Sequence, residues 1–355
     1  MWFTSATADG KKQFVYCVDP VTGNVLHHTL LFENPDPEPL GNDINTYASP
    51  SCVLEPGAVY VHFGTYGTAR LDARTGKVVW QNRDLPVRHY RGPGSSPVLF
   101  EDLLILTFDG IDQQYLAALD KNTGKLVWRT DRSTDFRDIG IDGKPAGGGD
   151  FRKAFGTPGL VEVNGRTQVV SVGARAAFGY DARTGEEIWT VEHPDYNAAS
   201  RPVFYKNLAI INSGSRGSLT MAVRLDETTR GNVTNTHIAW QRRQGTPRLT
   251  SPVLAGDRLY TLVDNGVLYC VNAATGEEIW HGRLGGNFTA SPVLANGFLY
   301  CCDERGRTLV VQASEFEIVA RNELEEGMRA TPVVADGALY LRTFSHLYKI
   351  ASKKN

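Results

Sequence analysis

An eleven-residue motif recurs along the chain and constrains its fold more than any other feature of the sequence. It reads RLDARTGKVVW at 70–80, ALDKNTGKLVW at 118–128, GYDARTGEEIW at 179–189 and CVNAATGEEIW at 270–280, with a weaker copy, CVDPVTGNVLH, at 17–27. Short runs of Val, Leu, Ile and Tyr, separated by Gly, Asn and Asp turns, surround each copy, and no long stretch of helical periodicity competes with them. The repeat therefore predicts short β-strands joined by tight turns.

A second motif, Ser/Thr-Pro followed by a short apolar run, accompanies the first at a fixed phase. Its prolines stand at positions 50, 97, 158, 252, 292 and 332, with a variant at 202. Their spacing is mostly about one propeller blade, and each unit contains four strand-like runs. Four consecutive antiparallel strands per unit are typical of a β-propeller blade. We predict an all-β chain that forms an eight-bladed β-propeller of four-stranded antiparallel blades.

The blade boundaries follow from the two motifs. Complete blades are predicted at approximately 46–82, 95–131, 156–191, 199–242, 250–284 and 290–324, and partial blades at 1–32 and 330–350. We interpret residues 1–355 as a single propeller domain whose first and last blades are incomplete. We expect both missing strands to come from an N-terminal segment upstream of Met1, together with any export signal, because the chain itself shows no signal peptide.

The residues of the recurrent motif have structural roles that the turn chemistry predicts. In the copy at 118–128, Gly124 can adopt the positive φ of a tight turn, and Asp120 can accept hydrogen bonds from turn amides. Trp128 is expected to fill the space between neighbouring blades. The equivalent residues of the other copies are Asp72, Gly76, Trp80, Asp181, Gly185, Trp189, Gly276 and Trp280. We predict that these residues are structural and not catalytic.

The pattern Asp-x-x-Thr-Gly-Lys/Glu-x-x-Trp resembles the PQQ-like repeat of the quinoprotein alcohol dehydrogenase-like β-propellers. The resemblance covers nearly the whole chain and implies the propeller fold. It does not imply a cofactor, because many members, including the lipoprotein scaffold of outer-membrane barrel assembly, bind no quinone. The scaffold-type members are bacterial and exported. The resemblance therefore implies a periplasmic or extracellular location for the full-length protein.

Long insertions are predicted to gather on one face, opposite the Thr-Gly turns. They span 33–47, 83–94, 109–114, 131–155 and 192–199, and loops longer than the connection requires are often functional. The candidate ligand-binding residues of this loop-rich face are Arg88, His89, Tyr90, Arg91, Asp109, Asp112, Arg175, Tyr196, Arg216, Arg248, Arg305 and Arg329. Converging arginines favour an anionic ligand or an acidic protein surface. The alternative is that they pair with Asp109, Asp112, Asp195 and Asp264 on adjacent loops.

No catalytic or metal-ligating residue is predicted. The sequence contains no His-Glu-x-x-His, Cys-x-x-Cys, Gly-x-Ser-x-Gly or Walker motif. Quinoprotein alcohol dehydrogenases carry a vicinal disulfide against the quinone, but Cys301 and Cys302 lie inside a predicted strand, so their side chains should point to opposite faces. The net charge of −2 favours neither nucleic acid nor an anionic membrane, and no stretch approaches the roughly 20 apolar residues of a membrane span.

Three functions are compatible with this pattern. The leading hypothesis is a non-catalytic, monomeric propeller scaffold that binds a protein or an anionic polymer on its loop-rich face and requires no cofactor. The first alternative is an oxidoreductase that holds PQQ and calcium in the central channel. The second alternative is a carbohydrate-binding protein, which Tyr47, Tyr90 and Tyr196 in the long loops would support.

Overall fold

The computed structural model describes residues 1–215 and 217–352, which form eight β-sheets and two short 3-10 segments. The predicted all-β, eight-bladed β-propeller is confirmed, with mostly four-stranded antiparallel blades and with three-stranded first and last sheets. The chain divides into two compact units. The first unit contains residues 1–197 and 230–232, and the second contains residues 198–229 together with the residues from 233 onward.

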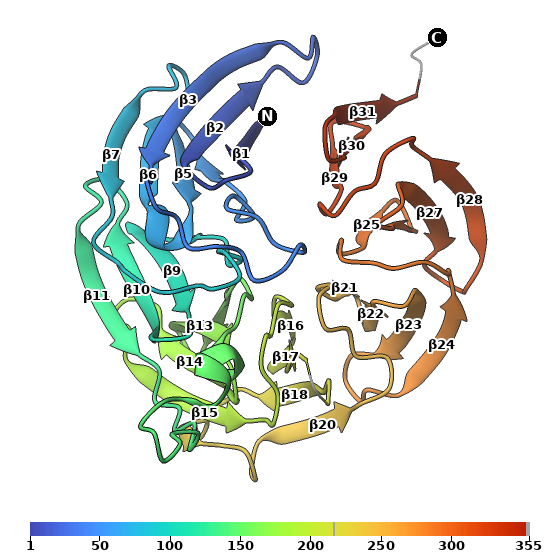
Figure 1. Ribbon diagram of the computed structural model, residues 1–355. Helices are drawn as coiled ribbons and strands as arrows, with labels where there is room; N and C mark the ends of the chain where they lie inside the picture. The colour runs from blue at the N-terminus through green and yellow to red at the C-terminus, as the bar shows by residue number, and fades with distance from the viewer. Residues whose placement is uncertain (216, 353–355) are drawn as a thin grey trace. The chain divides into compact units, whose positions relative to one another are not determined.

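The first unit contains four sheets, and in each of them consecutive strands pair in chain order (Figure 1). The first sheet is β1 (Trp2–Ala6), β2 (Lys12–Val18) and β3 (Val25–Glu33), and the second is β4 (Val53–Glu55), β5 (Ala58–His62), β6 (Thr68–Asp72) and β7 (Val78–Asn82). The third is β8 (Val98–Phe100), β9 (Leu103–Asp109), β10 (Gln114–Asp120) and β11 (Leu126–Asp131). The fourth is β12 (Gly159–Val163), β13 (Arg166–Val172), β14 (Ala176–Asp181) and β15 (Glu187–Glu192), and β19 (Gly231–Asn232) adds to it in parallel with β15.

The second unit contains the other four sheets. The first of them is β16 (Val203–Tyr205), β17 (Leu208–Asn212), β18 (Thr220–Arg224) and β20 (Ile238–Arg242). The second is β21 (Val253–Ala255), β22 (Arg258–Leu262), β23 (Val267–Asn272) and β24 (Glu278–Arg283). The next is β25 (Val293–Ala295), β26 (Phe298–Cys302), β27 (Arg307–Gln312) and β28 (Ile318–Glu323). The last is β29 (Val333–Ala335), β30 (Ala338–Arg342) and β31 (Leu347–Ala351).

Within each unit, the hydrophobic clusters lie between successive sheets. All five residues of β5 are buried, because both faces of this strand pack against neighbours. One cluster joins Tyr60 and Trp80 of the second sheet to Leu104 and Tyr115 of the third. Burial on both faces explains why inner strands such as β5 and β9 are apolar along most of their length instead of alternating.

The Thr-Gly turn is a contact point between blades. Gly124 has a φ of +72°, and Asp120 Oδ1 accepts hydrogen bonds from the amides of Asn122 (3.0 Å) and Thr123 (2.7 Å). The ring of Trp80, from the preceding blade, lies only 2.5 Å from the position that a Cβ on Gly124 would occupy. Trp80 Nε1 also donates to the carbonyl of Lys121 at 2.9 Å. Glycine is needed here both for the turn and for the close approach of the indole.

Other blade junctions in each unit repeat this contact, with two informative variations. Trp128 covers Gly185 in the first unit, and Trp240 covers Gly276 in the second. In the weak copy of the motif, His27 replaces the tryptophan and lies over Gly76. Trp189 differs, because its ring lies against Gly179 of its own blade and its Nε1 donates to Gln168 Oε1 at 2.8 Å. The missing side chain at position 179 makes room for this inward orientation.

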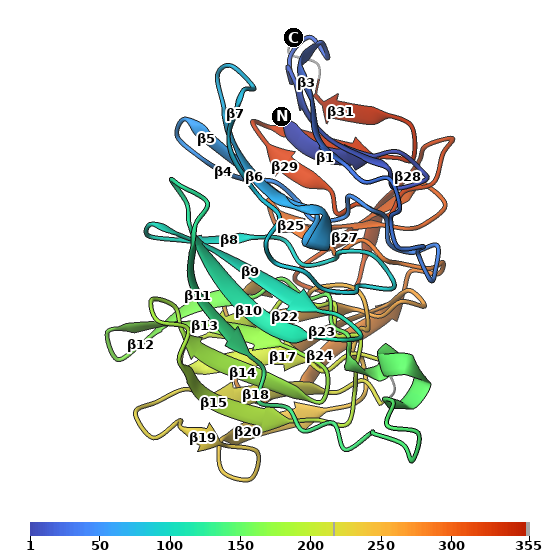
Figure 2. The same ribbon diagram turned by 60° about the vertical axis from the view of Figure 1, so that its left-hand side comes forward.

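The long loop 131–155 contains the 3-10 segment η2 (Ala146–Arg152), which Figure 2 shows projecting beyond the strands of its unit. Its three glycines, 147–149, all have a positive φ. A Cβ on Gly149 would lie 2.3 Å from the carbonyl oxygen of Ile111, so a glycine at this position lets η2 approach the 109–114 loop closely.

Candidate binding surface

Three loops of the first unit, 33–47, 83–94 and 131–155, are joined into one surface, which we call the three-loop platform. The amide of Tyr90 donates to Glu38 Oε2 at 2.8 Å, and the carbonyl of Tyr90 accepts from the amide of Gly41 at 2.8 Å. Arg91 binds both carboxylate oxygens of Asp150, at 3.1 and 3.2 Å. Segments that are far apart in the sequence therefore hold one another in place.

The 109–114 loop attaches to the same surface through Arg88. The amide of Arg88 donates to Asp112 Oδ1 at 2.8 Å, and its carbonyl accepts from the amide of Ile111 at 2.8 Å. The guanidinium of Arg88 pairs with Glu38 at 3.0 Å. The structure thus brings together four of the sequence-predicted residues, Arg88, Tyr90, Arg91 and Asp112. It also adds Glu38 and Asp150, whose pairing depends on loop conformations that no repeat encodes.

The ring of Tyr90 lies close to the side chains of Arg91 and Lys153. The φ of Tyr90 is +62°, in the left-handed region, and the bonds of its amide and carbonyl to the 33–47 loop hold it there. The Arg91 guanidinium carbon lies 5.4 Å from the centre of the ring, and Lys153 Nζ lies 5.2 Å from it. Contact with two cations over its π-system fixes the position of this ring, which is still 39% exposed.

Lys153 is a buried lysine of the platform that the sequence analysis did not identify. Its side chain has no exposed surface, and Nζ contacts the Asp150 carboxylate and donates to the Asp150 carbonyl at 2.8 Å. Burial, and then the nearby charge of Arg91, lowers the pKa of Lys153 to about 7. A lone lysine next to a glycine-rich loop gives no sequence signal for such burial.

We expect Lys153 to make the stability of the protein pH-dependent. Between about pH 7 and pH 10 the unfolded chain keeps the lysine proton that the folded chain releases, so this group favours folding more as the pH rises. The difference in unfolding free energy between the wild type and Lys153→Met should change by up to about 1.4 kcal/mol per pH unit in that range. Urea denaturation of both proteins from pH 6 to 10 measures it. A pH-independent difference would contradict the lowered pKa.

The other predicted residues of the first unit are held by contacts within that unit. His89 is buried, its Nε2 accepts from the amide of Thr65 at 3.2 Å, and burial lowers its pKa to about 4. Arg175 donates to the carbonyl of Pro194 at 2.6 Å, which ties it to the 192–199 loop. Tyr196 packs edge-on against Phe151 of η2. Asp109 is buried and binds Arg132, which was not among the predicted residues.

The remaining predicted residues belong to the second unit, except that Arg216 lies outside the described residues. Arg248 pairs with Asp264 at 2.6 Å, as the pairing alternative anticipates. The amide of Arg305 donates to Asp303 Oδ1 at 3.0 Å, and the Arg329 guanidinium lies 5.9 Å from the Phe344 ring. The candidate residues therefore form two sets, one in each unit, and several of their cations already have carboxylate partners.

The three-loop platform also exposes apolar side chains. Ile44 is 48% exposed, Ile139 is 60% exposed and Ile141 is fully exposed. These residues project from loops that are held by ion pairs and backbone hydrogen bonds, so the platform carries exposed apolar side chains on fixed loops.

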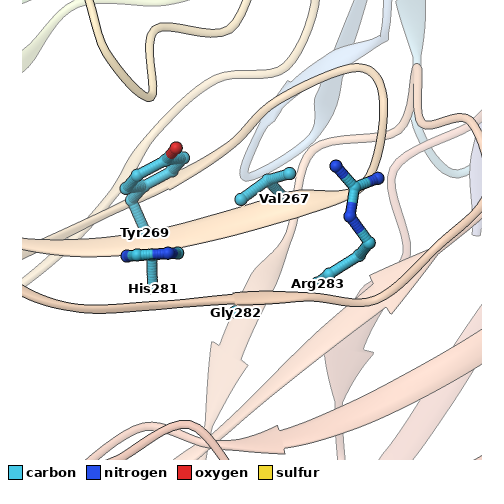
Figure 3. Close-up of a pocket in the computed structure, with 5 residues that line it drawn as sticks. All are labelled: Val267, Tyr269, His281, Gly282 and Arg283. Carbon is cyan, nitrogen blue, oxygen red and sulfur yellow. The ribbon is translucent and has the colours of Figure 1, made fainter.

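Two pockets of the second unit lie away from all the predicted site residues. The first, of about 300 Å³, is lined by Val267, Tyr269, His281, Gly282 and Arg283 (Figure 3). Figure 3 shows the rings of Tyr269 and His281 stacked on neighbouring strands, with Arg283 further along β24. The second, a groove of about 600 Å³, lies between the last two sheets.

The described residues contain no group of three or more His, Cys, Asp or Glu side chains placed to hold a metal ion. Cys301 and Cys302 are both buried, but in different hydrophobic clusters on opposite faces of β26. In the part of the chain that the structure describes, no helix is long and apolar enough to cross a membrane.

Comparisons with known proteins agree on the fold. The family model described as outer membrane protein assembly factor BamB matches residues 67–227, 222–318 and 264–353. No curated protein matches the sequence. Among solved structures, BamB from Moraxella catarrhalis is similar at 16% identity and a TM-score of 0.62, over 96% of this chain and 92% of that one.

Two dehydrogenases are also similar in structure. A europium-containing methanol dehydrogenase has 13% identity and a TM-score of 0.69, over 96% of this chain and 80% of that one. The quinohemoprotein alcohol dehydrogenase from Comamonas testosteroni has 15% identity and a TM-score of 0.65, over 94% and 68% of the two chains. At these identities the similarity shows the propeller fold alone.

Proposed function

Because the chain belongs to the family of outer membrane protein assembly factor BamB, we propose that it is a non-catalytic propeller scaffold that binds a partner protein through its loop-rich face. The observation that carries the proposal is the three-loop platform, where exposed isoleucines project from loops that are fixed by ion pairs. The family membership suggests that the protein is exported and that its partner takes part in outer membrane protein assembly. The proposed scaffold acts as a monomer.

The charges of the platform favour a protein over an anionic polymer. Arg88 and Arg91 already bind Glu38 and Asp150, so an anionic ligand would have to displace a carboxylate from each cation. The platform is a mixture of paired charges and exposed apolar side chains, and an apolar patch surrounded by polar groups is typical of protein interfaces. The partner surface should therefore be apolar at its centre and should leave these ion pairs intact.

Site-specific photo-crosslinking tests this proposal. A photoreactive residue in place of Ile141, on the platform, should crosslink to a discrete protein in cells that express the natural partner. The same residue in place of Lys125, in a Thr-Gly turn, should give no crosslink above background. Mass spectrometry of the crosslinked band identifies the partner and checks whether it is a component of outer membrane protein assembly.

The oxidoreductase alternative predicts a different result. If the protein bound PQQ with calcium, adding both would produce an absorbance change and dye-linked alcohol oxidation, and Arg91→Ala would abolish the turnover. We expect neither signal. Turnover of this kind, or a crosslink at Lys125 with none at Ile141, would contradict the scaffold proposal. A glycan array tests the carbohydrate-binding alternative in the same way.

A further inference from the structure

The smaller pocket of the second unit, of about 300 Å³, lies on one face of the outer two strands of its sheet. Val267 and Tyr269 come from β23, and Arg283 and His281 are their register partners on β24, so all four side chains share that face. Figure 3 shows the side chain of Val267 between the Tyr269 ring and the Arg283 guanidinium. The volume is at the lower end of the range for ligand pockets, which favours a small ligand.

The Tyr269 ring is held in place by its surroundings. Gly245 lies against the face of the ring, where a Cβ would be 2.7 Å from the ring atoms, and the carbonyl of Gly245 accepts from Thr261 Oγ1 at 2.7 Å. The Arg242 guanidinium carbon lies 5.5 Å from the centre of the ring. The His281 ring stacks on it with 5.3 Å between the ring centres. Because the aromatic wall of the pocket is already ordered, a ligand does not have to pay for ordering it.

Three polar groups of the pocket are available to a ligand. The Tyr269 hydroxyl, His281 Nε2 and the Arg283 guanidinium have no hydrogen-bond or ion-pair partner among the described residues. The other ring nitrogen, His281 Nδ1, lies 2.6 Å from Glu278 Oε1, and Glu278 Oε2 lies 3.8 Å from a guanidinium nitrogen of Arg242. The Glu278 carboxylate is therefore already shared by two basic side chains, and the charge of Arg283 is left without a counterion.

The equivalent side chains of the second sheet have a structural role that these lack. Gln81 and Arg83 stand one and three residues after the tryptophan of the motif, the places that His281 and Arg283 occupy on β24. Gln81 donates to the carbonyl of Leu31 at 2.8 Å, and Arg83 donates to the last carbonyl of β3 at 3.4 Å. Both contacts join β7 to the preceding sheet. Since Arg283 makes no such contact among the described residues, packing between blades does not account for it.

We propose that this pocket binds a small soluble phosphomonoester. The Arg283 guanidinium binds two phosphate oxygens at once, and the Tyr269 hydroxyl donates to the third, whereas a carboxylate has only two oxygens to offer. His281 Nε2 accepts the proton of a singly protonated phosphate or, when the ring is itself protonated, donates to the dianion. The organic group of the ester packs against Val267. The site lies in the second unit and does not depend on the function proposed for the three-loop platform.

Titration with phenyl phosphate, followed by NMR of the valine methyl groups, tests the site and its chemistry. Phenyl phosphate should bind the 355-residue protein with a Kd on the order of 1 mM or lower. It should shift the methyl resonances of Val267 and leave those of Val319, 44% exposed on β28, unchanged. Inorganic phosphate, which lacks the apolar group, and benzoate, which lacks the third oxygen, should each bind about tenfold more weakly. Equal binding of inorganic phosphate or of benzoate would overturn the assignment to a phosphomonoester.

Three variants separate the pocket from general attraction between phosphate and the protein surface. Arg283→Gln should weaken the binding of phenyl phosphate at least about tenfold, and Tyr269→Phe about threefold, because it removes one hydrogen bond and keeps the ring. Arg321→Gln removes an exposed arginine from β28 that does not line the pocket, and this variant should bind like the wild type. All three should keep the melting temperature of the wild type within a few degrees. Equal binding by Arg283→Gln and Arg321→Gln would overturn the proposal.

A lipid with the same headgroup chemistry is the remaining source of a phosphomonoester. Phosphatidylcholine vesicles that contain phosphatidic acid should leave the protein in the supernatant when they are sedimented, because the proposed ligand is a soluble ester. Sedimentation of the wild type together with these vesicles, lost in Arg283→Gln, would assign the pocket to a membrane lipid and would overturn the proposal of a soluble ligand.

Discussion

Replacing Arg132 by alanine should lower the free energy of unfolding by about 3–5 kcal/mol. The side chains of Arg132 and Asp109 are each only 1% exposed, and two hydrogen bonds of 2.6 and 2.7 Å join them. Arg132 also donates to Ser171 Oγ at 2.8 Å, which links the third sheet to the fourth. Without the guanidinium, the Asp109 carboxylate would remain buried without a cation. Urea denaturation followed by tryptophan fluorescence measures the loss.

Two further variants test the physical reason for this loss. Arg137→Ala removes an ion pair to Asp135 in which the side chains are 86% and 73% exposed, and it should cost less than about 1 kcal/mol. The double variant Arg132→Met with Asp109→Leu should recover most of the stability, because neither charge is then left buried alone. An Arg132→Ala loss no larger than that of Arg137→Ala would contradict the role given to the buried pair.

Trp80→Ala should lower the free energy of unfolding by a similar amount, about 3–5 kcal/mol. Trp80 is 9% exposed, packs in the cluster between the second and third sheets, and covers the Gly124 turn of the next blade. Removing the indole leaves a cavity between blades and deprives the Lys121 carbonyl of its hydrogen-bond donor. Thermal and urea denaturation of the same samples provide the measurement.

The adjacent residue is the natural control for Trp80. Val79 is 52% exposed on the same strand, and Val79→Ala should change stability by no more than about 0.5 kcal/mol. Trp80→Phe should fall between the two, since it keeps apolar contact and loses the hydrogen bond to Lys121. A Trp80→Ala loss below about 1 kcal/mol would show that the tryptophan does not hold neighbouring blades together.

The framework of this protein could be predicted from its sequence because the same turn motif recurs in five of the eight blades. Each copy of the motif specifies a turn with a positive-φ glycine and a large side chain four residues later, and even the weak copy places His27 over Gly76. Trp189 and β19 could not be predicted in this way. The orientation of Trp189 depends on the absent side chain of Gly179, and the pairing of β19 with β15 depends on an insertion outside the repeat.

The candidate site was less predictable. Loop length identified the segments that form the three-loop platform, and charge identified Arg88 and Arg91. Their partners Glu38 and Asp150, and the buried Lys153, could not be found from the sequence, because the loops have no periodicity. The contacts of Glu38 and Asp150 also join positions that are 50 and 59 residues apart. Ion pairs between irregular loops follow from the folded conformation and leave no local signal in the sequence.

We propose that the repeats build the framework while the three-loop platform recognises a partner. Two matched double variants test it most directly: Ile139→Ser with Ile141→Ser on the platform, and Lys77→Ser with Lys125→Ser in the Thr-Gly turns. Both should fold with the melting temperature of the wild type, and the amount of partner protein that co-purifies with each should be measured. We expect the platform variant to lose the partner and the turn variant to retain it. Loss of the partner from the turn variant alone would contradict the account.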